Sequence, residues 1–186
     1  MRALTGYPLW FGLIAAGLKP DENRDRNLVR REDYGVPFAI HNGAAQAPKK
    51  QAVTWGKIAQ IAPDLIDGWS RDDEATWPEW YRLSRITKAV IAVATIERRA
   101  FIGRRTSDAS PEDWLFDVGT CERICPRAQR RFAFGPVIYM LRDVRKLATP
   151  VPCPGKMGFW TLPEDVERAV TAQLISAPAE SVKGRT

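Results

Sequence analysis

Residues 17–24 read Gly-Leu-Lys-Pro-Asp-Glu-Asn-Arg, and the rest of the chain is organised around this stretch. It directly follows an apolar segment, residues 8–16, which begins with proline and is closed by the glycine. Proline suits the first turn of a helix and glycine suits the left-handed position after the last turn, so this segment is predicted to be a helix. If the chain is extended from Glu22 onward, Glu22 and Arg24 share a face, because alternate residues of a strand point to the same side. Lys19 then lies just across a turn and can reach the same space.

The three charged side chains differ in what they offer a ligand. Lysine supplies a mobile point charge, arginine a planar fork of donors, and glutamate an acceptor or proton carrier. Such a trio can hold a phosphate or the edge of a base, or perform acid–base chemistry. The alternative is a solvated turn with an internal ion pair, and the residue types leave both open.

The spacing of Gly17, Lys19, Glu22 and Arg24 resembles the Gly-x-Lys-x-x-Glu-x-Arg signature of the ASCH family, a PUA-like superfamily. The flanking pieces are similar too, and the resemblance covers roughly residues 2–46 and 86–162. They are Ala3-Leu4-Thr5, Ala39-Ile40-His41, Val90 to Thr95, Phe134-Gly135-Pro136 and Pro152-Cys153-Pro154-Gly155-Lys156. The resemblance implies an α+β fold, a PUA-like mixed β-barrel flanked by helices. We therefore expect one domain over residues 1–175, with a helical insertion at about 47–84 and a flexible tail at 176–186.

The resemblance also implies a basic cleft that binds RNA, DNA or a nucleotide, and we expect a binding module for single-stranded RNA or a modified nucleoside. Lys19 and Arg24 would contact phosphate or a base carbonyl, while Glu22 would orient Arg24 or accept from a base amino group. Arg26 and His41 complete the predicted ligand-binding set. For Arg26 the alternative is a solvated loop, and for His41 it is a hydrogen-bonded structural residue.

A hydrolase is the second hypothesis. One branch of the family removes the acetyl group from acetylated cytidine, and another relative is a metal-dependent ribonuclease. In the first branch the signature lysine works with a threonine three positions later, where this chain has Glu22 instead. In a ribonuclease Lys19 and Glu22 would be base and acid, and Arg24 the phosphate clamp. A lysine acts as a base only when burial lowers its pKa. No cofactor is expected, except a divalent metal for a ribonuclease.

Composition favours an anionic partner. The chain of 186 residues carries a formal net charge of +6, which favours nucleic acid. Within the binding hypothesis, RNA is expected more than DNA. Cys121, Cys125 and Cys153 are predicted to be isolated thiols, the alternative being a zinc site with the single histidine. The sequence has no apolar run as long as a membrane span and no signal-peptide pattern, so a cytoplasmic location is expected.

The remaining segments give coarser predictions. Helices are expected at residues 54–66 and 163–174, with a further helix start at 110–113, and strands at 36–42, 86–96, 132–141 and 156–162. Arginines between 123 and 131 form either a patch beside the barrel or internal ion pairs. In residues 67–84, Trp69, Trp77, Trp80 and Tyr81 alternate with acidic residues, which favours packing over base stacking. A protein-interaction adaptor that uses this insertion is the third hypothesis.

Overall fold

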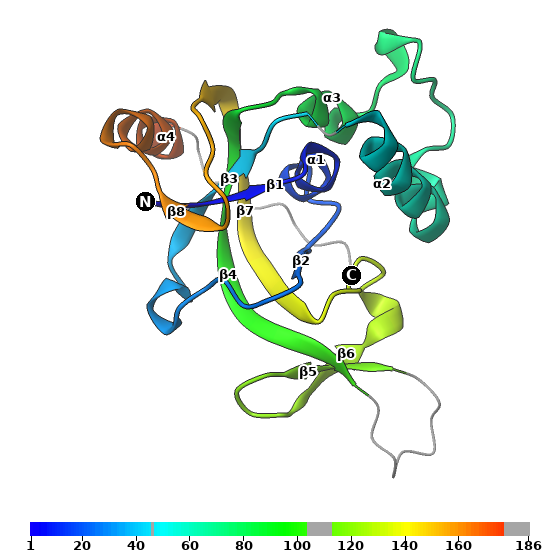
Figure 1. The fold of residues 1–186 in the computed structure, drawn as a ribbon, viewed down its shortest axis with the longest axis vertical. Coiled ribbons are helices and arrows are strands. Elements are labelled where there is room, and N and C mark those ends of the chain that lie inside the picture. Colours follow the sequence, from blue (N-terminus) through cyan, green and yellow to red (C-terminus); the bar gives the residue numbers. More distant parts are fainter. Residues whose placement is uncertain (46, 104–112, 177–186) are drawn as a thin grey trace. The chain divides into compact units, whose positions relative to one another are not determined.

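The computed structural model describes residues 1–45, 47–103 and 113–176 (Figure 1). The fold is α+β, as predicted: the described residues form a mixed sheet of eight strands with four α-helices. The sheet is open in the described ranges, with the strand order β2-β7-β4-β3-β1-β8. Off this path, β5 pairs with β4, and β6 pairs with β5. The strands are β1 (Arg2–Gly6), β2 (Asp21–Arg24), β3 (Pro37–Asn42), β4 (Ala89–Gly103), β5 (Trp114–Asp117), β6 (Arg123–Pro126), β7 (Val137–Pro152) and β8 (Phe159–Thr161).

The chain divides into two compact units. The first unit comprises Met1–Leu18, Pro37–Ala94 and Asp143–Thr186, and the second comprises Lys19–Val36 and Thr95–Arg142. The long strands β4 and β7 each contribute residues to both units. The single domain over residues 1–175 stays a prediction. The predicted flexible tail lies outside the described residues from 177 onward, and so do positions 110–112 of the predicted helix start.

In the first unit, β1 pairs with β3 in parallel and with β8 in antiparallel fashion. Helix α1 (Pro8–Ala15) has its proline at the first position, as predicted. It closes on Gly17, whose φ of +73° is the left-handed conformation that glycine adopts without strain. The Gly17 and Leu18 amides donate to the Ile14 and Leu13 carbonyls, both at 2.9 Å. These paired bonds satisfy the carbonyls at the helix end and fix the point where the chain leaves it.

The insertion in the first unit is helical, as expected, but its boundaries differ from the prediction. Helix α2 (Pro48–Ile61) begins six residues earlier than residue 54, since a proline suits the first helical position. It ends before Pro63, which opens a short 3-10 turn, because the residue preceding a proline is disfavoured in the helical conformation. Helix α3 (Glu79–Arg85) follows and packs against α1.

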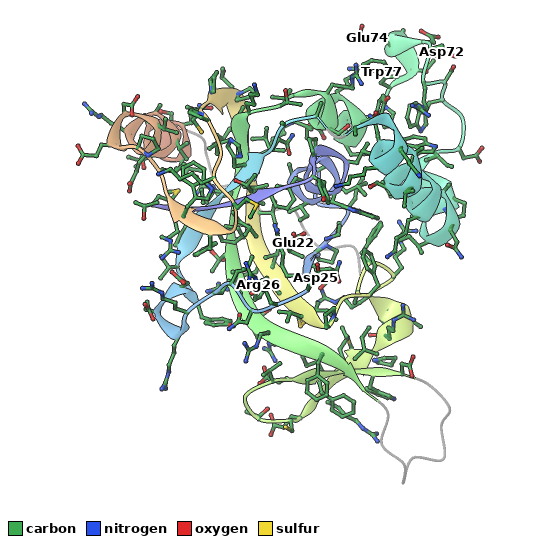
Figure 2. All side chains as sticks on the ribbon, in the orientation of Figure 1. Glu22, Asp25, Arg26, Asp72, Glu74 and Trp77 are labelled. Atoms are coloured by element: carbon green, nitrogen blue, oxygen red, sulfur yellow. The ribbon has the colours of Figure 1, made fainter. Side chains whose placement is uncertain are left out.

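The tryptophans of the insertion pack against one another. Ring centroids of Trp55, Trp69, Trp80 and Tyr81 lie 4.8–5.9 Å apart, and Trp80 and Tyr81 are buried. Packing was the favoured interpretation of these aromatics, and it is confirmed. The ring centroids of Trp77 and Tyr81 lie 4.9 Å apart. Trp77 lies at the outer end of the insertion with Asp72 and Glu74 (Figure 2).

In the second unit, β2 pairs antiparallel with β7, from Asp21 opposite Met140 to Arg24 opposite Val137. Strands β4, β5 and β6 form a second antiparallel ladder. The core of this unit contains the buried residues Ala100, Leu115, Ala133, Ile138 and Met140. Strand β7 starts at Val137 rather than at residue 132, because side-chain hydrogen bonds to Asn23 occupy the backbone of residues 132–135 instead.

The C-terminal helix α4 (Glu164–Ser176) confirms the prediction for residues 163–174. Its first turn carries Glu164, Asp165 and Glu167, which interact favourably with the positive end of the helix dipole. Across the described ranges, no helix has the length and apolar character needed to cross a bilayer.

Candidate functional site

Strand β2 positions the charged residues of the signature. The Leu141 amide donates to the Pro20 carbonyl at 2.9 Å, which extends the β2–β7 pairing to the start of the strand. Successive side chains of a strand point to opposite faces, so Glu22 and Arg24 share one face while Asp21 and Asn23 share the other. The two faces hold two different sets of polar contacts.

Lys19, Glu22 and Arg24 form a continuous cation–anion–cation triad, as predicted. Lys19 Nζ lies 3.3 Å from Glu22 Oε2, and Arg24 Nη2 lies 2.9 Å from Glu22 Oε1. Lys19 Nζ also donates to the backbone carbonyl of Asp21. Lys19 is only 1% exposed and the side chains of Glu22 and Arg24 are 8% and 19% exposed. The triad is therefore largely withdrawn from water and not solvated, although the internal ion pairing of the alternative is present.

A second ion pair lies next to the triad in the chain. Arg130 Nη1 donates to Asp21 Oδ1 at 3.1 Å, and Asp21 is completely buried. The other carboxylate oxygen, Oδ2, is buried and has no hydrogen-bond partner among the described residues. Sequence reasoning missed both residues as site members. Two signals in the sequence point to them. Strand alternation places the Asp21 side chain on the other face of β2 from that of Glu22, and a run of arginines lies between residues 123 and 131.

Asn23 holds in place the segment that follows Arg130. Its Nδ2 donates to the Phe132 carbonyl at 2.8 Å, and its Oδ1 accepts from the Phe134 and Gly135 amides at 3.0 and 3.1 Å. One asparagine thus takes the place of a backbone partner at three of the four loop positions 132–135. The Asp21 and Asn23 face of β2 therefore supports the site, while the Glu22 and Arg24 face carries the triad.

Burial acts on the protonation of the two innermost groups. Burial lowers the pKa of Lys19, although the carboxylates of Glu22 and Asp21 oppose the shift. Burial raises the pKa of Asp21, against the opposing charges of Arg130 and Lys19. Both shifts favour the neutral form of the group concerned.

Arg26 does not belong to this buried group. It is exposed and follows the end of β2, beside the exposed Asp25 (Figure 2). The contacts that join Lys19, Glu22 and Arg24 do not include it. Its predicted role as a phosphate contact on the rim of the site stays a prediction.

His41 lies in the first unit and makes only internal contacts there. Trp160 Nε1 donates to Thr5 Oγ1 at 2.9 Å, and that hydroxyl lies 3.2 Å from His41 Nδ1. His41 Nε2 lies 3.0 Å from the Cys153 carbonyl, which can only accept. The chain of bonds is satisfied when Nε2 carries the proton and Nδ1 accepts from the threonine. These contacts match the structural alternative given for His41, whose place in the ligand-binding set stays a prediction.

We expect His41 to titrate below the ordinary histidine value. Burial lowers its pKa, against the raising effect of the Cys153 carbonyl. Because the folded pKa lies below the unfolded value of about 6.5, the unfolded chain binds more protons and stability falls as the pH drops below that value. The chain has one histidine, so its ring proton gives a single NMR titration. A midpoint at or above 6.5 would contradict the dominance of burial over the Cys153 hydrogen bond, and His41→Gln is the control that removes this part of the pH dependence of stability.

The three cysteines are free thiols, of which Cys121 is exposed, Cys125 half-buried and Cys153 buried. His41 contacts the backbone of Cys153, not its sulfur. Within the part of the chain that the structure describes, no three metal-ligating side chains are grouped closely enough to hold an ion.

The outer end of the insertion carries a polar hollow of about 320 Å³. It is lined by Arg71, Asp72, Trp77, Tyr81 and Arg85. Arg85 lies over the Trp77 ring, with its guanidinium carbon 5.8 Å from the ring centroid. An adaptor function would use the exposed Arg71, Asp72 and Arg85 and the half-buried Trp77 rather than Trp80, which is buried in the aromatic packing.

No family model matches the sequence, and no curated protein matches it. Among solved structures, the chain is similar to ASCH from Zymomonas mobilis, with a TM-score of 0.42 and 12% identity over 92% of this chain and 93% of that chain. Two single-substitution variants of the same protein match with the same TM-score and identity, over 94% and 96% of their chains.

Proposed function

We propose that this protein binds nucleic acid, with single-stranded RNA or a modified nucleoside as the ligand, at the triad of Lys19, Glu22 and Arg24. The observation that carries the proposal is the geometry of the triad. Each oxygen of Glu22 is engaged by a different cation, at 3.3 Å by Lys19 and at 2.9 Å by Arg24. Two cations are thereby fixed in orientation before any ligand arrives, which lowers the entropic cost of binding an anion.

The charges of the site favour an anionic ligand. Ion pairs of the described residues join three cations, Lys19, Arg24 and Arg130, to the two carboxylates of Glu22 and Asp21. Glu22 serves to orient Arg24, and the partly exposed guanidinium of Arg24 is the group that meets the ligand. Its planar fork of donors matches the oxygens of a phosphate or a base carbonyl.

The test is a titration of the protein with a short single-stranded RNA at several salt concentrations. Binding through phosphate contacts releases counterions, so the logarithm of the association constant should fall linearly with the logarithm of the salt concentration, by about 0.7 for each phosphate contact. Binding that does not change with salt, or no binding at low salt, would overturn the proposal. A duplex DNA of the same length is the comparison that separates RNA from general polyanion binding.

A hydrolase of the same ligand class is the second candidate, and the burial of Lys19 is the observation that favours it. A lysine serves as a general base when burial lowers its pKa, and Lys19 meets this condition. In this scheme Lys19 takes the proton from the attacking group and Glu22 serves as the acid. The same RNA mixtures, incubated with and without a divalent metal, test it. RNA recovered intact after long incubation would leave the binding function alone.

A further inference from the structure

The ladder of β4, β5 and β6 in the second unit has one face in the core and one face outward. Ala100 and Leu115 are completely buried in the core of the unit, with Ile102 packed against them. Alternation then places Phe101 and Gly103 of β4, and Trp114 and Phe116 of β5, on the opposite face. The register aligns them, since Phe101 pairs with Phe116 and Gly103 with Trp114. Arg123 of β6 pairs with Phe116 and joins this face. We call it the aromatic face.

Two of the aromatic rings on this face are already packed against each other. The rings of Phe101 and Phe116 are stacked, with centroids 5.5 Å apart and planes at 22°. Phe116 is 4% exposed, whereas Phe101 and Trp114 remain half-buried, so part of their surface is open. A Cβ on Gly103 would lie 3.1 Å from the Phe116 ring and 3.2 Å from the Phe101 ring. The glycine therefore leaves the space in which both rings lie against the backbone.

The part of the aromatic face around Trp114 carries a positive charge. The guanidinium carbon of Arg123 lies 5.0 Å from the centroid of the Trp114 ring. Further along β4, alternation places both Arg99 and Glu97 on the same face as Phe101, so the charge there is mixed. Asp117 pairs with the core residue Ala100, and its carboxylate accepts from the Gly119 and Thr120 amides. An aromatic surface with an arginine over its tryptophan complements a ligand that carries both planar rings and negative charge.

We propose that the aromatic face stacks the bases of single-stranded RNA. Bases that are unpaired stack on aromatic side chains and on arginine guanidinium planes, and every base offers such a face. Trp114 and Phe101 supply the rings, while Arg123 supplies a guanidinium plane and a charge for the neighbouring phosphate. The inference rests on the proposed function, because it assigns a second contact region for the same RNA within the same unit as the triad.

The experiment compares two single-stranded oligomers of equal length and phosphate number, a uridine oligomer and its abasic counterpart. Wild-type protein should bind the base-containing oligomer more tightly than the abasic one. Trp114→Leu should lose about tenfold or more in affinity for the base-containing oligomer, since a stacked base contributes about 1–3 kcal/mol. Its affinity for the abasic oligomer and its salt dependence should stay at wild-type values, because the phosphate contacts remain.

Three further variants separate stacking from structural effects. Trp114→Phe keeps an aromatic ring and should retain most of the affinity, and Phe101→Leu should reduce it as Trp114→Leu does. Tyr7→Ala removes an aromatic side chain that is 51% exposed on the first unit and should leave the affinity unchanged. If wild-type protein binds both oligomers equally, or if Trp114→Leu binds as wild type does, the stacking inference is overturned while the RNA function stands. If wild-type protein binds neither oligomer, both proposals are overturned.

Discussion

Glu22→Ala should lower the free energy of unfolding by about 3–5 kcal/mol, the typical loss when one partner of a buried ion pair is removed. Glu22 neutralises two cations at once, through Oε2 to Lys19 and Oε1 to Arg24. Without Glu22, the Lys19 ammonium loses its carboxylate partner while it stays buried at 1% exposure. Its hydrogen bond to the Asp21 carbonyl remains. An uncompensated buried charge is more costly than the pair was favourable, so the effect should be large. Chemical denaturation of both proteins measures it.

The control for this change lies in the same unit. Arg30 and Glu32 form an ion pair at 3.6 Å whose side chains are 72% and 67% exposed. Glu32→Ala should leave the unfolding midpoint almost unchanged, since exposed pairs contribute little. Adding Lys19→Met to Glu22→Ala should recover part of the lost stability, because the double change also removes the unpaired cation. A loss for Glu22→Ala as small as for Glu32→Ala would mean that water reaches the triad.

Lys19→Met should separate stability from ligand binding. Methionine is similar in length to lysine and adapts to irregular core space, so the side chain should be accommodated. The change removes a buried ammonium whose desolvation is costly, while Glu22 keeps its contact with Arg24 at 2.9 Å. We therefore expect stability equal to or above that of the wild type. Affinity for single-stranded RNA should fall by about tenfold or more, because the buried Lys19 charge no longer offsets that of Glu22 beside Arg24, and a unit charge about 8 Å from a phosphate contributes about 2 kcal/mol at an effective dielectric constant of about 20.

Much of the triad was predictable because its geometry is local. Proline at the start of α1 and Gly17 after its end define where the helix stops, and both are explicit in the sequence. Strand alternation then places Glu22 and Arg24 on one side, three to five residues from Lys19. The α+β class followed from the same stretch together with the pieces that resemble the ASCH family. Each of these inferences needs only residues close together in the chain.

The parts that could not be predicted depend on distant residues. The burial of Lys19 and Asp21 results from packing by segments far along the chain, and Arg130 reaches Asp21 from 109 positions away. The interruption of the predicted strand at residues 132–135 has the same origin, since Asn23 takes the backbone groups that a neighbouring strand would use. The aromatic face was also hidden, because Phe101, Trp114 and Arg123 come together only through the register of three strands.

The most direct test of the central claim, that the buried triad binds nucleic acid, is the dissociation constant of a short single-stranded RNA for wild-type protein and for Lys19→Met. Both proteins are measured at one low salt concentration, with their unfolding free energies determined in the same buffer. A loss of about tenfold or more in affinity, in a variant at least as stable as the wild type, is the result we predict. Equal affinities in two equally folded proteins would contradict the claim and show that the triad serves the fold alone.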